Sequence, residues 1–227
     1  MERGTRSKRA GVALAAALVA GAAQAAGGHH DVDDASILPR GECEQESWFT
    51  RIDGGRQRLH AGVNCRVGPV ELGLAGEHGR LGDEPSRTFW GVEVKWAREV
   101  ADGFSVGFDI APVAQSNAHP HYAGTTAYAI ATWQLRPDLA VHANYGRDFE
   151  RGEPDQPRGG VAAEWMPVPH WSLVLERYRE QGSHFLRAGA RWAAGRNWSI
   201  DFSRAQRVAG PQRSNWTLGL TFDLDDD

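Results

Sequence analysis

A two-residue alternation of apolar with polar or small residues recurs through this chain and constrains its fold more than any other feature. Between residues 160 and 223 it occurs four times, in segments that begin near Trp171, Leu186, Trp198 and Trp216. Successive side chains of a β-strand point to opposite faces, so this period indicates strands with one apolar and one polar face. Short and longer connections alternate between these segments, which is typical of a series of β-hairpins.

The same alternation extends upstream and predicts eleven clear strands, with a doubtful twelfth at residues 47–52. In a single-chain bacterial barrel, closure without a free edge usually takes an even number of antiparallel strands. The sequence therefore predicts an all-β fold, a closed up-and-down antiparallel transmembrane β-barrel of about twelve strands over residues 47–224, with ten as the alternative. Twelve strands would place both termini and the short turns at one end, and the longer loops, of which residues 147–158 are the longest, at the other.

A soluble barrel of the lipocalin kind shares this period but would turn its apolar face inward. The tryptophans favour the membrane alternative, because they recur on the apolar parity close to the short turns. Such a ring is an aromatic girdle at a membrane interface, where an indole has an apolar body and a polar N–H. Trp133 lies in the segment 125–135, which is apolar on both faces. It joins this girdle if its side chain points outward, and that direction is open. The expected girdle comprises Trp96, Trp133, Trp165, Trp171, Trp192 and Trp198.

The N-terminus resembles a secretory signal. A basic stretch ending at Arg9 precedes an apolar run over residues 11–20 and the small-residue site Ala23-Gln24-Ala25. We expect residues 1–25 to be a signal peptide and the mature chain to reach the outer membrane. Removing an n-region of charge +3 from a chain of charge −4 leaves a mature charge of −7. So acidic a protein is a poor candidate for binding nucleic acid, and none is expected as a partner.

Residues 26–46 and 225–227 are acidic and lack a hydrophobic period. We predict a flexible periplasmic tail at the first and an acidic C-terminal tail at the second. The cluster His29-His30-Asp31 could bind a transition metal, but no second ligand set stands at a fixed spacing, and a solvated acidic tail is favoured. His119-Pro120-His121 is interpreted in the same way as a loop, and no metal or cofactor is expected.

Cys43 and Cys65 lie on opposite arms of a hairpin centred near Gly54-Gly55, in a chain bound for an oxidising compartment. Their spacing places them roughly opposite each other. If Trp48 faces outward with Cys65, however, Cys43 points the other way. A disulfide and two unpaired buried thiols both remain open.

Side chains on the polar parity of the strands are expected to line the lumen of the barrel. These side chains either pair with one another across a filled interior or line a narrow polar pore, since twelve strands fall between filled barrels of about eight and open ones of about sixteen. Their mixed signs argue against a dedicated anion pore. The expected lumen-lining residues are Arg66, Glu71, Glu93, Lys95, Asp109, His142, Asn144, Glu164, Glu176, Arg187, Arg191 and Asp201. Midspan positions expected to face lipid are Val92, Ala188 and Ile200.

Two histidine–serine motifs raise an enzymatic alternative. His170-Trp171-Ser172 resembles the His-x-Ser motif of lipid A deacylase barrels, but it lies at a predicted periplasmic turn, whereas that family acts near the outer leaflet. Ser183-His184 is merely adjacent in sequence, which gives no nucleophile–base geometry. We therefore expect no enzyme and no catalytic residues.

The last strand carries a family resemblance. Thr217, Gly219, Phe222 and Leu224 match the β-signal of bacterial outer-membrane proteins, although Asp225-Asp226-Asp227 follows where many members end on the aromatic residue. The chain thus resembles the small porin-like barrels of Gram-negative outer membranes. The resemblance implies insertion by the barrel-assembly machinery.

Together these features predict a monomer surrounded by outer-membrane lipid, acting as a narrow channel or transporter for small solutes. A pore-less barrel serving envelope structure or interaction is the main alternative. The sequence favours a lipid hydrolase or a soluble ligand-binding barrel less than either of these.

Overall fold

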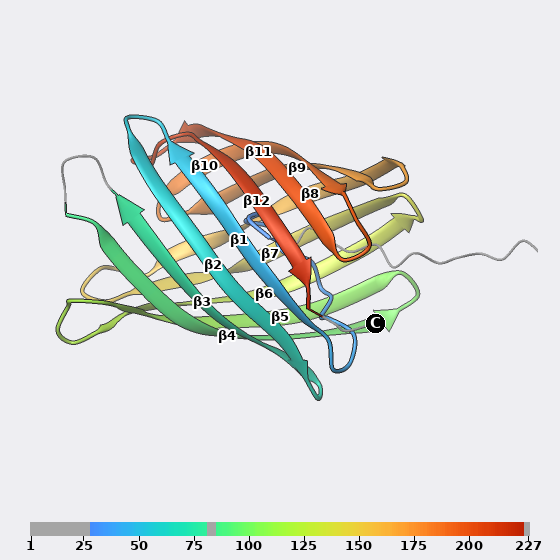
Figure 1. The fold of residues 1–227 in the computed structure, drawn as a ribbon, viewed down its shortest axis with the longest axis horizontal. Helices are drawn as coiled ribbons and strands as arrows, with labels where there is room; N and C mark the ends of the chain where they lie inside the picture. Colours follow the sequence, from blue (N-terminus) through green and yellow to red (C-terminus); the bar gives the residue numbers. More distant parts are fainter. Residues whose placement is uncertain (1–27, 81–84, 225–227) are drawn as a thin grey trace, which may run out of the picture.

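The structure, a computed structural model, describes residues 28–80 and 85–224. The predicted signal peptide and the C-terminal residues 225–227 lie outside the described residues. Within the described part the chain forms one closed β-barrel (Figure 1). Its strands are β1 (Cys43–Ile52), β2 (Arg56–Val67), β3 (Val70–Arg80), β4 (Arg87–Ala101), β5 (Phe104–Gln115), β6 (Tyr122–Arg136), β7 (Leu139–Glu150), β8 (Gln156–Val168), β9 (Trp171–Glu180), β10 (Ser183–Ala193), β11 (Trp198–Ala209) and β12 (Asn215–Asp223).

Every strand pairs antiparallel with its neighbour in sequence, and β12 returns to pair with β1 and close the barrel. Nine residue pairs join these two strands, from Glu44 opposite Asp223 to Ile52 opposite Asn215. Closure gives every strand two partners and leaves no exposed sheet edge. The prediction of a closed twelve-stranded barrel is confirmed, including the doubtful first strand.

The two ends of the barrel differ in their connections. One end, here called the turn end, carries the approach to β1, the end of β12 and connections such as residues 68–69 and 137–138. The opposite end, the loop end, carries longer connections such as residues 116–121, together with the short turns at 53–55 and 181–182. The prediction of a long loop at residues 147–158 was wrong. β7 continues to Glu150 and β8 begins at Gln156, because the charged residues Asp148 and Arg158 face each other inside the barrel.

Apolar side chains cover the outside of the barrel and polar ones fill its inside. Leu74, Leu175 and Leu218 are each more than half exposed, whereas Glu176, Asp109 and Asp201 are almost completely buried. This is the reverse of a soluble barrel. The ambiguous strand β6 follows the same rule: Trp133 points outward beside its alanines, and Ile130 is buried inside.

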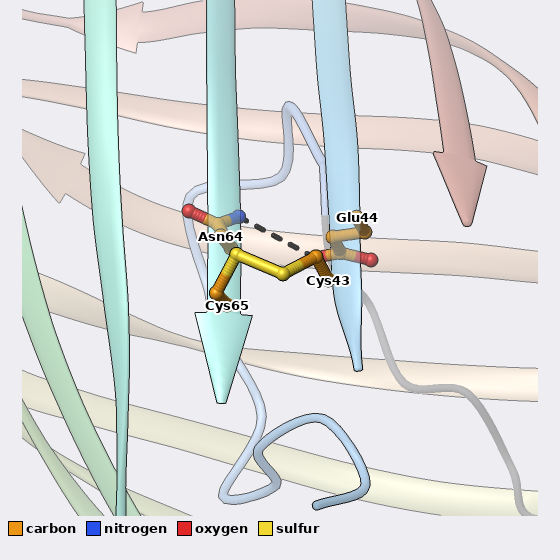
Figure 2. Close-up of a disulfide and its surroundings, with 4 residues drawn as sticks. All are labelled: Cys43, Glu44, Asn64 and Cys65. Atoms are coloured by element: carbon orange, nitrogen blue, oxygen red, sulfur yellow. Dashed lines mark hydrogen bonds between the residues drawn. A yellow bond between two sulfur atoms is a disulfide. The ribbon is translucent and has the colours of Figure 1, made fainter. Parts of the chain in front are cut away.

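Cys43 and Cys65 are joined by a disulfide between β1 and β2, directly opposite each other in the register, with their Cα atoms 4.1 Å apart. Figure 2 shows that the neighbouring residues Glu44 and Asn64 lie on the same two strands and hydrogen bond to each other. The parity conflict came from Trp48, which turns inward and stacks on His60 at 3.6 Å between ring centroids. With Trp48 inside, both cysteines lie on the outward parity.

The prediction of a flexible tail at residues 26–46 was wrong where the structure describes it. β1 begins at Cys43, and residues 28–42 that precede it are here called the lumenal segment (blue in Figure 1). Its first part runs inside the barrel, whereas residues 39–41 are exposed next to β1. Val32 is fully buried, and His29, Asp34 and Ala35 are less than 9% exposed. The segment has no hydrophobic period because its partners are polar side chains of the barrel wall.

No α-helix among the described residues has the length and apolar character needed to span a membrane.

Candidate functional site

The lumen is the candidate site, and its walls carry the polar residues that the alternation predicts there. Nine are buried: Glu71, Lys95, Asp109, His142, Asn144, Glu164, Glu176, Arg187 and Asp201. The other three, Arg66, Glu93 and Arg191, are half-buried. All twelve lie on the inward parity of their strands. The structure therefore brings together the whole expected set.

The shortest ion pairs between side chains of the wall lie beneath β9, β10 and β11. The guanidinium of Arg187 is 2.9 Å from the carboxylate of Glu176 on the neighbouring strand, and it also donates a hydrogen bond to the hydroxyl of Tyr178. Arg191 donates to Asp201 across β10 and β11. Charges withdrawn from water need such partners, because an unpaired buried charge is costly.

A second network links four strands at the turn end of the lumen. Thr132 of β6 and His142 of β7 share a hydrogen bond of 2.9 Å. The other ring nitrogen of His142 lies 3.5 Å from Glu164 of β8, which accepts a hydrogen bond of 2.6 Å from Ser172 of β9. This arrangement fixes side chains of the wall and gives Ser172 a structural partner.

The lumenal segment docks on both networks. The backbone N–H of Val32 donates to Glu176 at 2.9 Å, and the N–H of Ala35 donates to Thr132 at 2.8 Å. Further along, the N–H of Leu38 donates to Glu71, and its carbonyl accepts from Arg66, both at 2.8 Å. Wall side chains thus satisfy the backbone of a segment that has no secondary structure of its own.

Charged pairs hold the same segment across the width of the barrel. Asp31 lies 2.9 Å from Arg187 of β10 and 3.1 Å from Arg158 of β8. Asp33 lies 3.0 Å from Lys95 of β4, and the side-chain amide of Asn144 is placed to bond to its backbone N–H and carbonyl. These two carboxylates connect walls that no strand pairing joins.

Several of these residues were not predicted to line the lumen. The sequence pattern predicted Asp31 and Asp33 in a solvated tail, and Arg158 and Asp148 in a loop. Arg158 instead faces the lumen, where Asp31, Asp148 and Glu180 all lie within 3.5 Å of it. The one sequence signal was Val32, a large apolar residue inside an acidic run. It packs against Ala162, Val174, Tyr178, Phe185 and Ala205.

A cavity of about 650 Å³ occupies the part of the lumen that the segment leaves free. It lies toward the loop end beneath β2 to β7, and small inward residues such as Ala75, Gly91 and Ala111 make room for it. Its polar lining includes Glu77, Glu93 and Arg158. A space of this size is within the range of small-molecule sites.

Two rings of aromatic residues surround the outside. Trp96, Trp133, Trp165, Trp171, Trp192 and Trp198, the expected girdle, lie toward the turn end and are between 36% and 57% exposed. Trp90, Tyr122, Phe149 and Trp216 form a second exposed ring toward the loop end, which was not predicted from the sequence. Trp90 precedes Trp96 by six residues on β4. Six residues of a strand tilted by about 40° span roughly 15 Å along the barrel axis.

Polar anchors accompany both rings. At the turn end, the indole N–H of Trp165 donates to Asp138 at 3.2 Å, and hydrogen bonds from Arg136 lower the pKa of the same carboxyl group. At the loop end, the guanidinium of Arg204 lies over the ring of Trp216 and pairs with Asp53. In each ring, an aromatic side chain with an apolar body thus has a hydrogen-bonded or charged group beside it, as residues at a membrane interface do.

The histidine motifs do not assemble into a site. His170 is exposed in the turn between β8 and β9, while Ser172 is buried and bonded to Glu164. His184 and the buried Ser183 are neighbours on β10. The rings of His119 and His121 lie 4.8 Å apart in the loop between β5 and β6, and no group of metal-ligating residues is found in residues 28–80 and 85–224.

In β12, the residues of the predicted assembly signal divide between the two faces. Thr217 is buried and shares a 3.1 Å hydrogen bond with Thr50 of β1, whereas Phe222 and Leu224 are exposed outside. Gly219 faces inward, where an added Cβ would lie 3.1 Å from the ring of His29. The lumenal segment therefore gives this glycine a role in packing as well.

Solved structures with the same architecture are outer-membrane porins and related barrels. The KdgM porin is 12% identical, with a TM-score of 0.65 over 80% of this chain and 99% of the porin. The NanC porin is 11% identical, with a TM-score of 0.60 over 80% and 100%. The Acinetobacter baumannii outer membrane protein Omp33 is 10% identical, with a TM-score of 0.50 over 80% and 97%. At such identities the similarity establishes the fold.

The chain thus has the fold of the porin-like outer-membrane β-barrels, and the fold implied by the sequence resemblance is confirmed. The comparison with curated proteins finds no match. Within this class, the chain belongs to the family described as "Uncharacterised conserved protein UCP029691", whose profile matches residues 14–224.

Proposed function

We propose that this protein is an outer-membrane barrel that acts as a narrow channel for small polar solutes. The observation that carries the proposal is the distribution of side chains: apolar residues face outward between two aromatic rings, and ionisable residues face a lumen with a cavity. Only a lipid surround makes the exposed apolar band favourable. A lining of both charge signs suits polar solutes without strong selection for one ionic sign.

The orientation follows from the same class of barrel. Outer-membrane barrels place their short turns in the periplasm and their longer loops outside, so the turn end would face the periplasm. We infer export through the signal peptide at residues 1–25 and insertion through the β12 signal around Thr217, Gly219, Phe222 and Leu224. The protein would work as a monomer, without cofactor, metal or catalytic residue.

A pore-less barrel of the envelope is the second candidate. It is favoured by one observation, the lumenal segment, which occupies much of the interior and is held by several hydrogen bonds and ion pairs. The loops that such a barrel would use for interactions are short, since the connection expected at residues 147–158 is reduced to residues 151–155.

Planar-bilayer recordings of the refolded protein test the proposal. Discrete conductance steps with weak preference for either ion sign are expected, in salt and then with a panel of small solutes. Folding is checked beforehand by heat-modifiable mobility on gels. Silence at high loads of folded protein would instead favour the pore-less barrel, and recovery in the soluble fraction without detergent would exclude both.

A further inference from the structure

The lumenal segment is an ordered element that is fitted to the barrel without being a strand of it. Val32 is fully buried in a wall pocket that includes Tyr178 and Phe185. Glu176 receives the backbone N–H groups of both Asp31 and Val32, at 3.3 and 2.9 Å. Between residues 28 and 38 the hydrogen bonds to the wall use wall side chains, so this part could leave without breaking any hydrogen bond between strands. Glu42, next to β1, instead accepts a hydrogen bond of 2.9 Å from the backbone N–H of Arg66.

Both limbs of the segment reach the same end of the barrel. Gly28 lies beside Arg191 and Asp201, close to the turn-end limits of β10 and β11. From there the chain runs into the lumen as far as Val32, which packs against Tyr178 and Phe185, and then returns toward the turn end. Leu38 contacts Arg66 and Glu71 next to the turn between β2 and β3. A loop of this shape can withdraw through the turn end without passing its terminus through the barrel.

Charge explains what holds the segment and what its departure would change. Asp31 and Asp33 place two carboxylates against Arg187, Arg158 and Lys95. Without the segment, Arg187 keeps Glu176 as a partner, and Arg158 keeps Asp148 and Glu180. The lumen would lose three carboxylates, because Asp34 leaves with the other two, and Lys95 would lose the carboxylate that lies nearest to it.

We propose that residues 28–38 are a built-in stopper of the channel, held by Asp31 and Asp33, which sets both its width and its charge preference. The inference rests on the channel function proposed above. Removing the stopper widens the lumen beneath β6 to β11. It also removes the carboxylates of Asp31, Asp33 and Asp34 from the lumen, so the ion preference of the pore shifts toward anions.

Conductance of two variants tests the stopper. A chain lacking residues 28–38, and the full chain with Asp31→Asn and Asp33→Asn, should each conduct at least about twofold more than wild type and shift the reversal potential toward anion selectivity. The matched control is Asp53→Asn with Asp138→Asn, which removes two exposed carboxylates from turns outside the lumen and should change neither quantity. Unchanged conductance and selectivity in folded Asp31→Asn/Asp33→Asn protein would overturn the proposal.

A thiol-labelling experiment tests whether the stopper is seated in the lumen, without a measurement of current. The two native cysteines are bonded to each other, so Val32→Cys introduces the one free thiol. In the folded barrel this thiol should react with a charged maleimide at least about tenfold more slowly than that of Ser86→Cys at the exposed loop end, since it needs local opening first. The protection should fall when Asp31 and Asp33 are both replaced by asparagine.

The two readouts separate the possible failures. If Val32→Cys reacts as fast as Ser86→Cys in the otherwise wild-type folded barrel, the segment is not seated and the stopper is excluded, whatever the conductance. If the labelling behaves as expected but every variant is silent in bilayers, including the deletion, the channel function itself fails and the stopper fails with it.

Discussion

The two halves of the lumen are built differently although one continuous barrel encloses both. Beneath β8 to β11 the wall carries bulky or charged residues such as Tyr178, Phe185 and Arg187, and the lumenal segment packs against them. Beneath β3 to β5 the inward residues include Gly73, Ala75, Gly91 and Ala111, and the cavity remains. The filled half also holds the shortest ion pairs of the wall, Arg187 with Glu176 and Arg191 with Asp201.

This difference shows that the strand number alone does not decide whether a barrel of this size is open. The twelve strands enclose a space that their side chains do not fill completely, and the lumenal segment occupies one part of it while the cavity remains in the other. Here, small residues on three neighbouring strands keep one side open. The same wall therefore forms a packed core on one side and borders a cavity on the other.

The sharpest test of the contrast removes one carboxylate from each half. Glu176→Gln leaves Arg187 with a weaker partner in the filled half, and we expect the free energy of unfolding to fall by about 3–5 kcal/mol, the usual cost of breaking a buried ion pair. Glu93→Gln in the open half, beside Asp109, should change it by less than about 0.5 kcal/mol. Urea unfolding of both variants in lipid vesicles provides the measurement. Equal losses would mean that the halves do not differ energetically.

A second test compares the outer with the inner face at one height. Val92 lies outward between Trp90 and Trp96, and Val92→Arg should cost about 2–4 kcal/mol if it meets lipid near the midplane. Glu93→Arg, its inward neighbour, should cost much less and alter ion selectivity, as unfolding and reversal-potential measurements would show. A larger cost for the inward variant would contradict the assigned facing. Ile200, also expected at midspan, is less suitable because it pairs with Trp192 in the girdle.

The smallest effect should come from filling the open half. Ala111→Trp adds an indole to the cavity lining, so single-channel conductance should fall on the order of twofold, while stability changes little. Ala129→Trp places the same side chain on the lipid-facing side of β6 and should leave conductance unchanged. Equal conductance in the two variants would show that ions do not pass through this cavity.

The barrel could be predicted from the sequence because its main determinant is local. Alternation assigns each residue to a face from its nearest neighbours alone, so the inward positions of Glu176, Arg187 and Asp201 follow without knowledge of the partner strands. The even strand number then follows from closure. The facing of Cys43 could not be predicted correctly, because Trp48 was expected to point outward with the other apolar residues. Trp48 instead points inward and stacks on His60.

The lumenal segment could not be predicted in this way because its partners are distant in sequence. Asp31 pairs with residues 127 and 156 positions later, Arg158 and Arg187. An acidic run without a period is indistinguishable from a solvated tail when only neighbours are considered. Arg158 was misassigned for the same reason, since charges near a strand end were interpreted as a loop although they point into the lumen.

The hairpin-like path of residues 28–42 has a consequence for biogenesis. Because this stretch enters and leaves through one opening, the sheet can seal along β1 and β12 first and receive its insert afterwards, with no threading step. The insert is tied directly to β1, so its local concentration at that opening is high from the moment of sealing. Seating would then be a late, reversible event of maturation, separable in time from insertion into the bilayer.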